Sequence, residues 1–239
     1  MSKREMEAPW KAGLRAVQDN ALPSMLILAA ATGLVVSYYH IAVVKTYLDL
    51  LGEWNNRYPW TFAAVTTAFS AGFIPWCFRM CFPKIRPVHP VGDLIHSVLW
   101  WAFLGLVVSG FYHFQSYLFG DEVNFSTVGK KVLLDQLGFS ILIGAPFNAI
   151  SHYWKDHQWS FSALREALRP GWYRRLIVPN LLPNFLVWIP GNFIFYSMPL
   201  DLQLPVANCI GCYWALMCAR IATHSRAGNA IVAESHPVA

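Results

Sequence analysis

The side chains best suited to chemistry lie in apolar surroundings. Asp135, with Gln136 beside it, falls within an otherwise uncharged stretch from Val132 to Ile150. A carboxylate in a membrane segment is costly and usually faces a cavity or a partner. Asp135 and Gln136 therefore have two interpretations, as the lining of a pore or as polar contacts between helices. Lys131, one helical turn earlier, could pair with Asp135.

Cysteines offer a second chemistry. They are Cys77, Cys81, Cys209, Cys212 and Cys218. The spacing of Cys209 and Cys212 fits a redox pair or half of a four-ligand zinc site, which Cys77 and Cys81 could in principle complete. No thioredoxin-like context surrounds them, and buried thiols are ordinary in apolar helices. We therefore expect no metal and no cofactor, although bound lipids such as cardiolipin are compatible with the sequence.

Histidines in apolar segments raise the question of haem. His96 and His113 stand roughly 25 Å apart if they share one helix, so they cannot ligate one haem together. His40 could partner either of them. We interpret all three as hydrogen-bonded histidines at helix interfaces. The sequence contains no phosphate-binding loop, dinucleotide fingerprint or hydrolase motif, so we expect no enzymatic activity.

The elements that would position these residues are long apolar segments. A helix needs roughly 20 mainly apolar residues to cross a bilayer. The sequence predicts six such spans: Leu22–Val44, Trp60–Phe78, Leu94–Leu118, Val132–Ile150, Ile177–Leu200 and Leu202–Ala219. Six crossings bring both ends of the chain to the same side of the membrane.

The distribution of positive charge supports six spans. Fourteen of the 18 Lys and Arg residues fall in the two tails and in the second and fourth connections, on one predicted side. The other side has Lys45, Arg57, Lys130 and Lys131. Such asymmetry is expected of a correct topology.

Composition agrees with this topology. The 239 residues are 56% hydrophobic and only 13% charged, against about 25% charged in a soluble domain. We therefore expect an all-α, polytopic membrane helix bundle of about six transmembrane helices. Because no basic run exceeds two residues, a nucleic-acid partner is not expected. Membrane lipids and other membrane-protein subunits are the expected partners.

Small residues predict close helix packing within the bundle. They recur at four-residue steps in two of the spans, and a glycine stands in a third. These residues are Ala29, Gly33, Ser37, Ala63, Thr67, Ala71 and Gly105. A further helix is expected to lie on the positive side, because Phe161, Leu164 and Leu168 share one face. It should end near Arg169, since Pro170 and Gly171 follow.

The fifth segment is rich in proline and asparagine. It contains Pro179, Pro183, Pro190 and Pro199. Proline removes a backbone donor and bends a helix, so the sequence predicts a kinked, centrally packed span that forms a hairpin with the last one. Its Asn184 and Asn192, together with Asp135, Gln136 and His113, are the candidates for pore lining or polar helix packing.

The order of motifs resembles a known family. The stretch Lys130-Lys131 and Leu133-Leu134-Asp135-Gln136-Leu137-Gly138-Phe139 is similar to a segment of the Mpv-seventeen and peroxisomal membrane protein family. Further matches are Tyr47, Tyr58-Pro59-Trp60, Thr66, Gly72, Gly110 with His113, Trp188, Phe195-Tyr196, Met198-Pro199-Leu200 and Trp214. The resemblance covers about residues 44–221.

The departures from the family are specific. Pro75 and Arg79 stand where the family has an Asp and a Gln, and Gln115-Ser116 replaces a Trp-Tyr pair. Near Ile194 a signature Asn is replaced, and Gln203 takes the place of a basic residue. The sequence is thus divided into residues 1–43, a tail and an added transmembrane helix, residues 44–221, a family-like membrane domain, and a polar tail over 222–239.

The resemblance implies a non-enzymatic protein of the mitochondrial inner membrane, with both termini on the matrix side, or less often of peroxisomes or plastids. Three functional hypotheses follow. The first is an accessory subunit of a respiratory-type inner-membrane complex. The second is a small-solute pore or channel-like protein of organelle membrane homeostasis, lined by Asp135, Gln136, Asn184 and Asn192. The third is a protein that binds haem or quinone.

Overall fold

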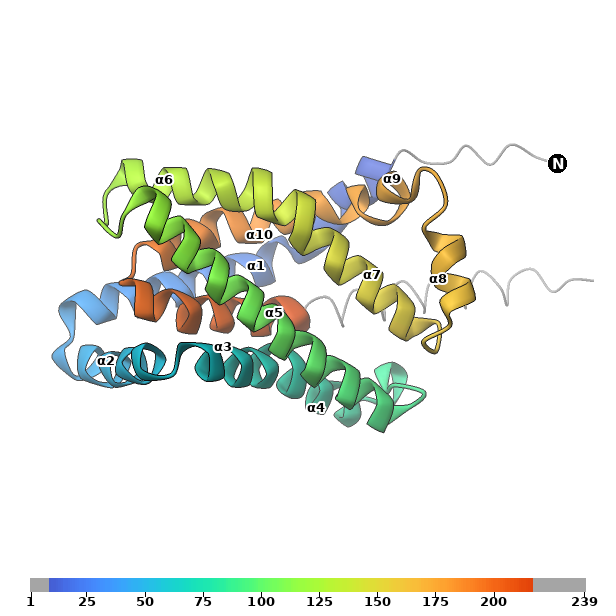
Figure 1. Ribbon diagram of the computed structural model, residues 1–239, viewed down its shortest axis with the longest axis horizontal. Helices are drawn as coiled ribbons and strands as arrows, with labels where there is room; N and C mark the ends of the chain where they lie inside the picture. Colours follow the sequence, from blue (N-terminus) through green and yellow to red (C-terminus); the bar gives the residue numbers. More distant parts are fainter. Residues whose placement is uncertain (1–8, 217–239) are drawn as a thin grey trace, which may run out of the picture.

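The predicted all-α fold is confirmed in the part of the chain that can be described. The computed structural model describes residues 9–216, which are helical apart from short turns and contain no strand (Figure 1). In chain order the elements are α1 (Pro9–His40), α2 (Ala42–Arg57), α3 (Pro59–Thr67), η1 (Ala68–Phe73), α4 (Ile74–Cys81), η2 (Pro83–Ile85), α5 (Pro90–Phe119), α6 (Phe125–Leu133), η3 (Leu134–Gly144), α7 (Ala145–Asp156), α8 (Phe161–Ala167), α9 (Trp172–Leu176) and α10 (Val178–Tyr196). A last helix covers 200–216.

Two π-helical segments join shorter helices into long ones. η1 links α3 to α4, and η3 links α6 to α7. Three helices are long and apolar enough to cross a membrane: Pro59–Cys81, Pro90–Phe119 and Phe125–Asp156. They contain the predicted second, third and fourth spans.

The remaining predicted spans are less clear-cut. The bent pair Ser24–His40 and Ala42–Arg57 would make a fourth span if it were counted as one. α10 and the helix over 200–216 run along the bundle beside the others (Figure 1), but they do not reach the same length and hydropathy. Prolines and asparagines lower the mean hydropathy of α10, and the description stops at residue 216. The count of six therefore stays a prediction.

The first predicted span is broken, so the expectation of one helix from Leu22 through Val44 is wrong. α1 ends at His40, Ile41 is extended (φ −119°, ψ 106°), and the chain bends by 102° into α2. Neighbouring contacts hold this bend. The Tyr38 hydroxyl donates to Asp49 Oδ1 at 3.0 Å, and the Tyr39 hydroxyl donates to the Ser197 carbonyl at 2.7 Å.

Close packing of α3 and η1 against α5 depends on small side chains. Ala63, Thr67, Ala71 and Gly105 are all buried. A Cβ added to Gly105 would lie 2.8 Å from Thr67 Cβ and closer still to the Ala63 carbonyl oxygen. Larger residues would therefore push α3 and α5 apart.

α1 packs along α10 with a different face from the one expected. Ser24, Ala31, Val35 and Tyr38 are buried, whereas Ala29 and Gly33 are exposed and Ser37 is half-buried. A Cβ at Gly33 would meet nothing within 4 Å. The small-residue positions of α1 are therefore turned largely outward.

The core lies between α1, α3, α5, α10 and the last helix. Its fully buried members include Val187, Phe195, Tyr196, Leu202 and Ile210. The central packing predicted for the proline-rich segment is confirmed, since α10 contributes three of these side chains. α10 also continues as one helix through Pro183 and Pro190.

The positive and less positive ends of the bundle are separated in space. α8, α9 and the connection after α4 lie at one end of the long axis, and α2 with the α5–α6 connection lies at the other (Figure 1). This is the arrangement that the charge count predicts. The helix expected near Phe161 is present as α8, and Gly171, with φ +82°, separates it from α9.

A proline in the fourth predicted span is compensated by a distant tyrosine. In η3 the Ala145 N–H donates to the Ser140 carbonyl, so the next donor in the π-helical pattern would come from residue 146. Pro146 has no N–H, and the Tyr173 hydroxyl instead donates to the Ile141 carbonyl at 2.8 Å. This bond attaches α9 to the middle of the span.

Candidate functional site

Asp135 lies in a buried polar cluster between η3 and α10. The carboxylate is 7% exposed. Its Oδ2 accepts a hydrogen bond of 2.7 Å from the Tyr196 hydroxyl, and its Oδ1 accepts one of 2.8 Å from Gln136 Nε2. Ser140 Oγ donates more weakly to Oδ1 at 3.4 Å. Every hydrogen bond described here comes from a neutral group.

The ion pair that spacing allows between Lys131 and Asp135 does not form among the described contacts. Lys131 is 2% exposed, and its Nζ lies 3.3 Å from Asp121 Oδ1. Asp121, in the α5–α6 connection, is 56% exposed. The lysine thus extends toward the end of the bundle, as expected of a long side chain that places its charge near water, while Asp135 turns toward α10.

Amide side chains around Asp135 are only partly hydrogen-bonded. Gln115 Nε2 donates to the Lys131 carbonyl at 2.9 Å, which joins α5 to α6. Within the described residues, Gln115 Oε1, Gln136 Oε1 and both polar atoms of Asn192 lack a hydrogen-bond partner of ordinary geometry. Asn192 nevertheless lies near enough to Asp135 to interact with its carboxylate. The cluster therefore has unused hydrogen-bonding capacity.

The structure brings together three of the five sequence-predicted residues. Asp135, Gln136 and Asn192 belong to one cluster. Asn184 stands two turns away on α10, roughly 12 Å along the axis, and its buried Nδ2 has no partner among the described residues. His113 is exposed and directs Nδ1 at the Ser109 carbonyl, 2.8 Å away.

Sequence reasoning missed Tyr196 and Gln115 as members of this cluster. Tyr196 was noted only as part of a motif, and Gln115 only as a departure from the family pattern. The bond from Tyr196 to Asp135 joins residues 61 positions apart, so no local spacing could indicate it. A tyrosine and a glutamine within otherwise apolar helices were the only available signals.

A second buried carboxylate lies at the positive end. Asp93, 5% exposed, accepts from Arg79 Nη1 at 3.2 Å, from Arg79 Nη2 at 2.5 Å and from Lys155 Nζ at 2.7 Å. These contacts connect α4, α5 and α7. In this cluster two cations bind one carboxylate. Such charge-assisted hydrogen bonds are strong, because the dielectric constant of a buried site is low.

His96, one of the three histidines considered for haem, uses both ring nitrogens in other contacts. Trp159 Nε1 donates to His96 Nδ1 at 3.2 Å, so that nitrogen is unprotonated. His96 Nε2 therefore carries the hydrogen and donates to Ser151 Oγ at 2.9 Å. Both ring nitrogens of His96 are used, which fits a hydrogen-bonded histidine at a helix interface.

Metal chemistry finds no support in the described residues. No group of three or more His, Cys, Asp or Glu side chains is placed to hold an ion in the part of the chain that can be searched. Cys77, Cys81, Cys209 and Cys212 are free thiols, and Cys218 lies outside the described residues.

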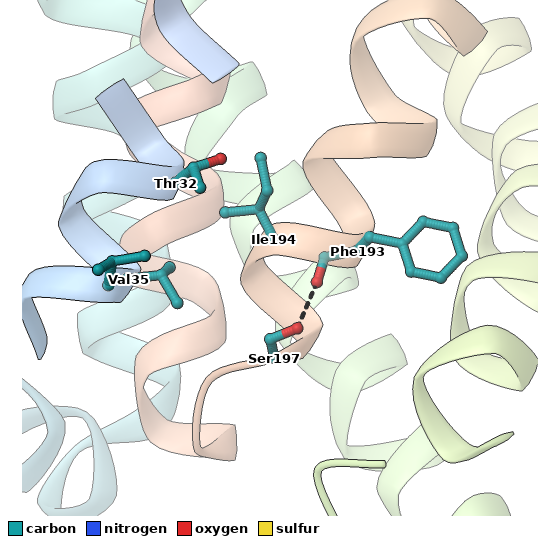
Figure 2. A pocket seen from close by; sticks show the side chains of 6 residues that line it. Thr32, Val35, Phe193, Ile194 and Ser197 are labelled. Carbon is teal, nitrogen blue, oxygen red and sulfur yellow. Dashed lines mark hydrogen bonds between the residues drawn. The ribbon is translucent and has the colours of Figure 1, made fainter. Parts of the chain in front are cut away.

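A shallow groove of about 230 Å³ separates α1 from α10 (Figure 2). Both hydroxyl groups that line the groove donate hydrogen bonds to backbone carbonyls four residues earlier in the chain. Thr32 Oγ1 donates to the Leu28 carbonyl at 2.8 Å, and Ser197 Oγ donates to the Phe193 carbonyl at 2.6 Å. The Phe193 ring points away from α1 (Figure 2) and stacks on Phe125. The groove therefore presents mainly hydrocarbon.

Taken together, the two carboxylate clusters can join helices, because each makes contacts between separate elements. Neither the α1–α10 groove nor a larger hollow beside α8 and α9 is lined by Asp135. The described hydrogen bonds of Asp135 are all to protein groups, namely Tyr196, Gln136 and Ser140.

Comparison with known proteins finds similarity to a yeast membrane protein. The chain is 27% identical over 118 residues to a protein of Saccharomyces cerevisiae named vacuolar membrane protein YOR292C. The aligned stretch covers 49% of this chain and 36% of the yeast protein. No family profile matches the chain, and no solved structure matches it. The similarity and the apolar helices together indicate a membrane protein.

Proposed function

We propose that this protein is a non-enzymatic, multi-pass membrane protein that serves as an accessory structural subunit of a larger assembly. The outward face of α1 is the observation that carries this proposal. Leu22, Met25 and Val36 are more than half exposed there, and Ala29 and Gly33 lie between them. Small residues on an open helix face allow a second helix to approach closely.

The closed geometry of the Asp135 cluster supports the same function. Intramembrane carboxylates that serve transport usually face a water-filled cavity. Here Tyr196 and Gln136 donate directly to Asp135, and the bond from Tyr196 holds α10 to η3. A structural role accounts for these contacts without a conducting path.

We place the protein in the mitochondrial inner membrane with both termini in the matrix, as a divergent member of the Mpv-seventeen and peroxisomal membrane protein family. The residues that carry the resemblance support this membership, because Asp135, Gln136 and Tyr196 meet in one cluster. The yeast relative is named for the vacuolar membrane, so location needs its own test. Imaging of a tagged chain, with protease protection of the tag in isolated mitochondria, should place it in the matrix. A vacuolar signal would contradict this location.

Purification in mild detergent tests the accessory role. We expect the protein to migrate within an assembly much larger than its own 27.1 kDa. Gly33→Leu should release it, because the added side chain would occupy the space that a neighbouring helix needs. Gly129→Leu is the matched control, since a Cβ there also meets nothing within 4 Å. Migration of the unmodified protein alone at its own mass would contradict the proposal.

A small-solute pore is the second candidate. The unpartnered amide atoms of Gln136 and Asn192 favour it, because a hydrated path would satisfy them. In planar bilayers, a pore of this kind would show conductance that Asp135→Asn alters in size or selectivity. Absence of conductance in the purified, folded protein would contradict the pore and leave the structural function as the remaining proposal.

A further inference from the structure

A hollow of about 600 Å³ lies at the positive end of the bundle, beside the two short helices α8 and α9. Tyr153 of α7, Ala167 of α8 and Arg175 of α9 contribute to its walls, together with Arg169 from the intervening turn. Two guanidinium groups thus border one opening, together with the carboxylate of Glu166. Arginine is well suited to bind phosphate because its planar donors match phosphate oxygens.

Arg175 is held in place by backbone carbonyls rather than by a carboxylate. Its Nη1 donates to the Pro170 carbonyl at 2.9 Å, and its Nη2 donates to the Ala167 carbonyl at 3.2 Å. These carbonyls follow the end of α8, where partial negative charge accumulates. In the residues that the structure describes, Arg175 forms no ion pair, so its positive charge is positioned but not neutralised.

Arg169 is available from the turn that follows α8. Its Nη1 lies 3.3 Å from Glu166 Oε1, and both side chains are 69% exposed. An ion pair with this exposure contributes little stability. Arg169 can therefore leave Glu166 and turn toward an anion in the hollow.

Two contacts favour a position of the hollow near the membrane–water boundary. Tyr173 attaches α9 to the Ile141 carbonyl of the apolar η3 segment. Desolvation by burial raises the pKa of the Tyr173 phenol, so it stays protonated and continues to donate. Trp154 packs on Phe161, with ring centroids 5.1 Å apart, and tryptophan favours the membrane–water boundary.

We propose that this hollow binds the phosphate group of an anionic phospholipid. Arg175 provides a fixed cation, Arg169 closes over the phosphate, and Leu176 borders the path of the acyl chains. The positive end of the bundle is also the face that attracts an anionic leaflet. This proposal concerns a lipid site and does not depend on whether the protein is a subunit or a pore.

Native mass spectrometry of the full chain in zwitterionic detergent tests the site. The protein is titrated separately with dioctanoyl phosphatidylglycerol, dioctanoyl phosphatidylcholine and inorganic phosphate. We expect phosphatidylglycerol to bind more tightly than phosphatidylcholine. Arg169→Gln should weaken phosphatidylglycerol binding about fivefold, as expected for loss of one cationic contact.

Arg174→Gln is the matched control, because it removes the same charge from the adjacent α9 but does not line the hollow. It should leave phosphatidylglycerol binding within about twofold of the unmodified protein. Three outcomes would overturn the proposal. They are equal binding of the two lipids, equal weakening by Arg174→Gln, and displacement of phosphatidylglycerol by low-millimolar inorganic phosphate.

Discussion

Two buried carboxylates in this bundle are stabilised in different ways. Asp93, at the positive end, is paired with the cations of Arg79 and Lys155. Asp135, further within the bundle, accepts hydrogen bonds from neutral groups, with Tyr196 the principal donor from another helix. Removal of one partner from a buried ion pair leaves a desolvated charge without its counter-charge. Loss of a neutral donor leaves only an unsatisfied hydrogen-bond acceptor, which costs less free energy. The two clusters should therefore respond very differently to substitution.

The largest effect is expected at Asp93. Asp93→Asn would leave Arg79 and Lys155, whose side chains are 17% and 10% exposed, without their shared carboxylate. We expect a loss of about 3–5 kcal/mol in the free energy of unfolding, measured by denaturant titration in mixed micelles. Asp49→Asn breaks a much more exposed pair with Lys45 and should change stability little. Equal effects at the two sites would show that burial does not determine the strength of these pairs.

A smaller effect is expected at Asp135. Asp135→Asn keeps the size of the side chain but replaces an acceptor with an N–H₂ donor. One of its hydrogen bonds must then weaken, and we expect a loss of about 1–3 kcal/mol in the same titration. A loss as large as that of Asp93→Asn would indicate that a cation acts on Asp135 after all.

Tyr196→Phe should lower the free energy of unfolding by less than Asp135→Asn does. It removes the hydroxyl but keeps the ring, which packs against Phe195 and Tyr112. Hydrogen bonds between membrane helices contribute about 0.5–2 kcal/mol, and we expect a loss in this range. If the bond carries the effect, combining Tyr196→Phe with Asp135→Asn should cost less than the sum of the two.

The smallest expected effect is the coupling free energy between substitutions at Lys131 and Asp135. Lys131 Nζ is directed at Asp121, so we expect Lys131→Met and Asp135→Asn to be additive within about 0.5 kcal/mol. A double-mutant cycle measures this directly. A coupling above that value would support the ion pair that the sequence spacing allows.

The sequence predicted the features that depend on local pattern. The apolar lengths, the proline-rich α10, the short helix ending before Gly171 and the separation of positive charge were all readable from spacing. Asp135 was identified because a lone carboxylate in an apolar run is conspicuous. Apart from the charge distribution, each of these signals lies in the same segment as the feature that it predicts.

The features that were missed depend on distant partners. The bend at Ile41 lacks a glycine or proline, and one of its holding contacts joins Tyr39 to Ser197. The Asp93 cluster combines residues 14 and 62 positions apart. Gly33 lies on the exposed side of α1 because the other face of this helix packs against α10. Because tertiary packing decides each of these, local spacing could not determine them.

The hydroxyl of Tyr173 is the donor that takes the place of the N–H missing at Pro146. The interfacial helix α9 is thereby fastened to η3, the same segment that begins with Leu134 and Asp135. A displacement of α9 would reach η3 through this phenol. The bundle thus contains a hydrogen-bonded connection between the short helices at its positive end and the segment that contains Asp135.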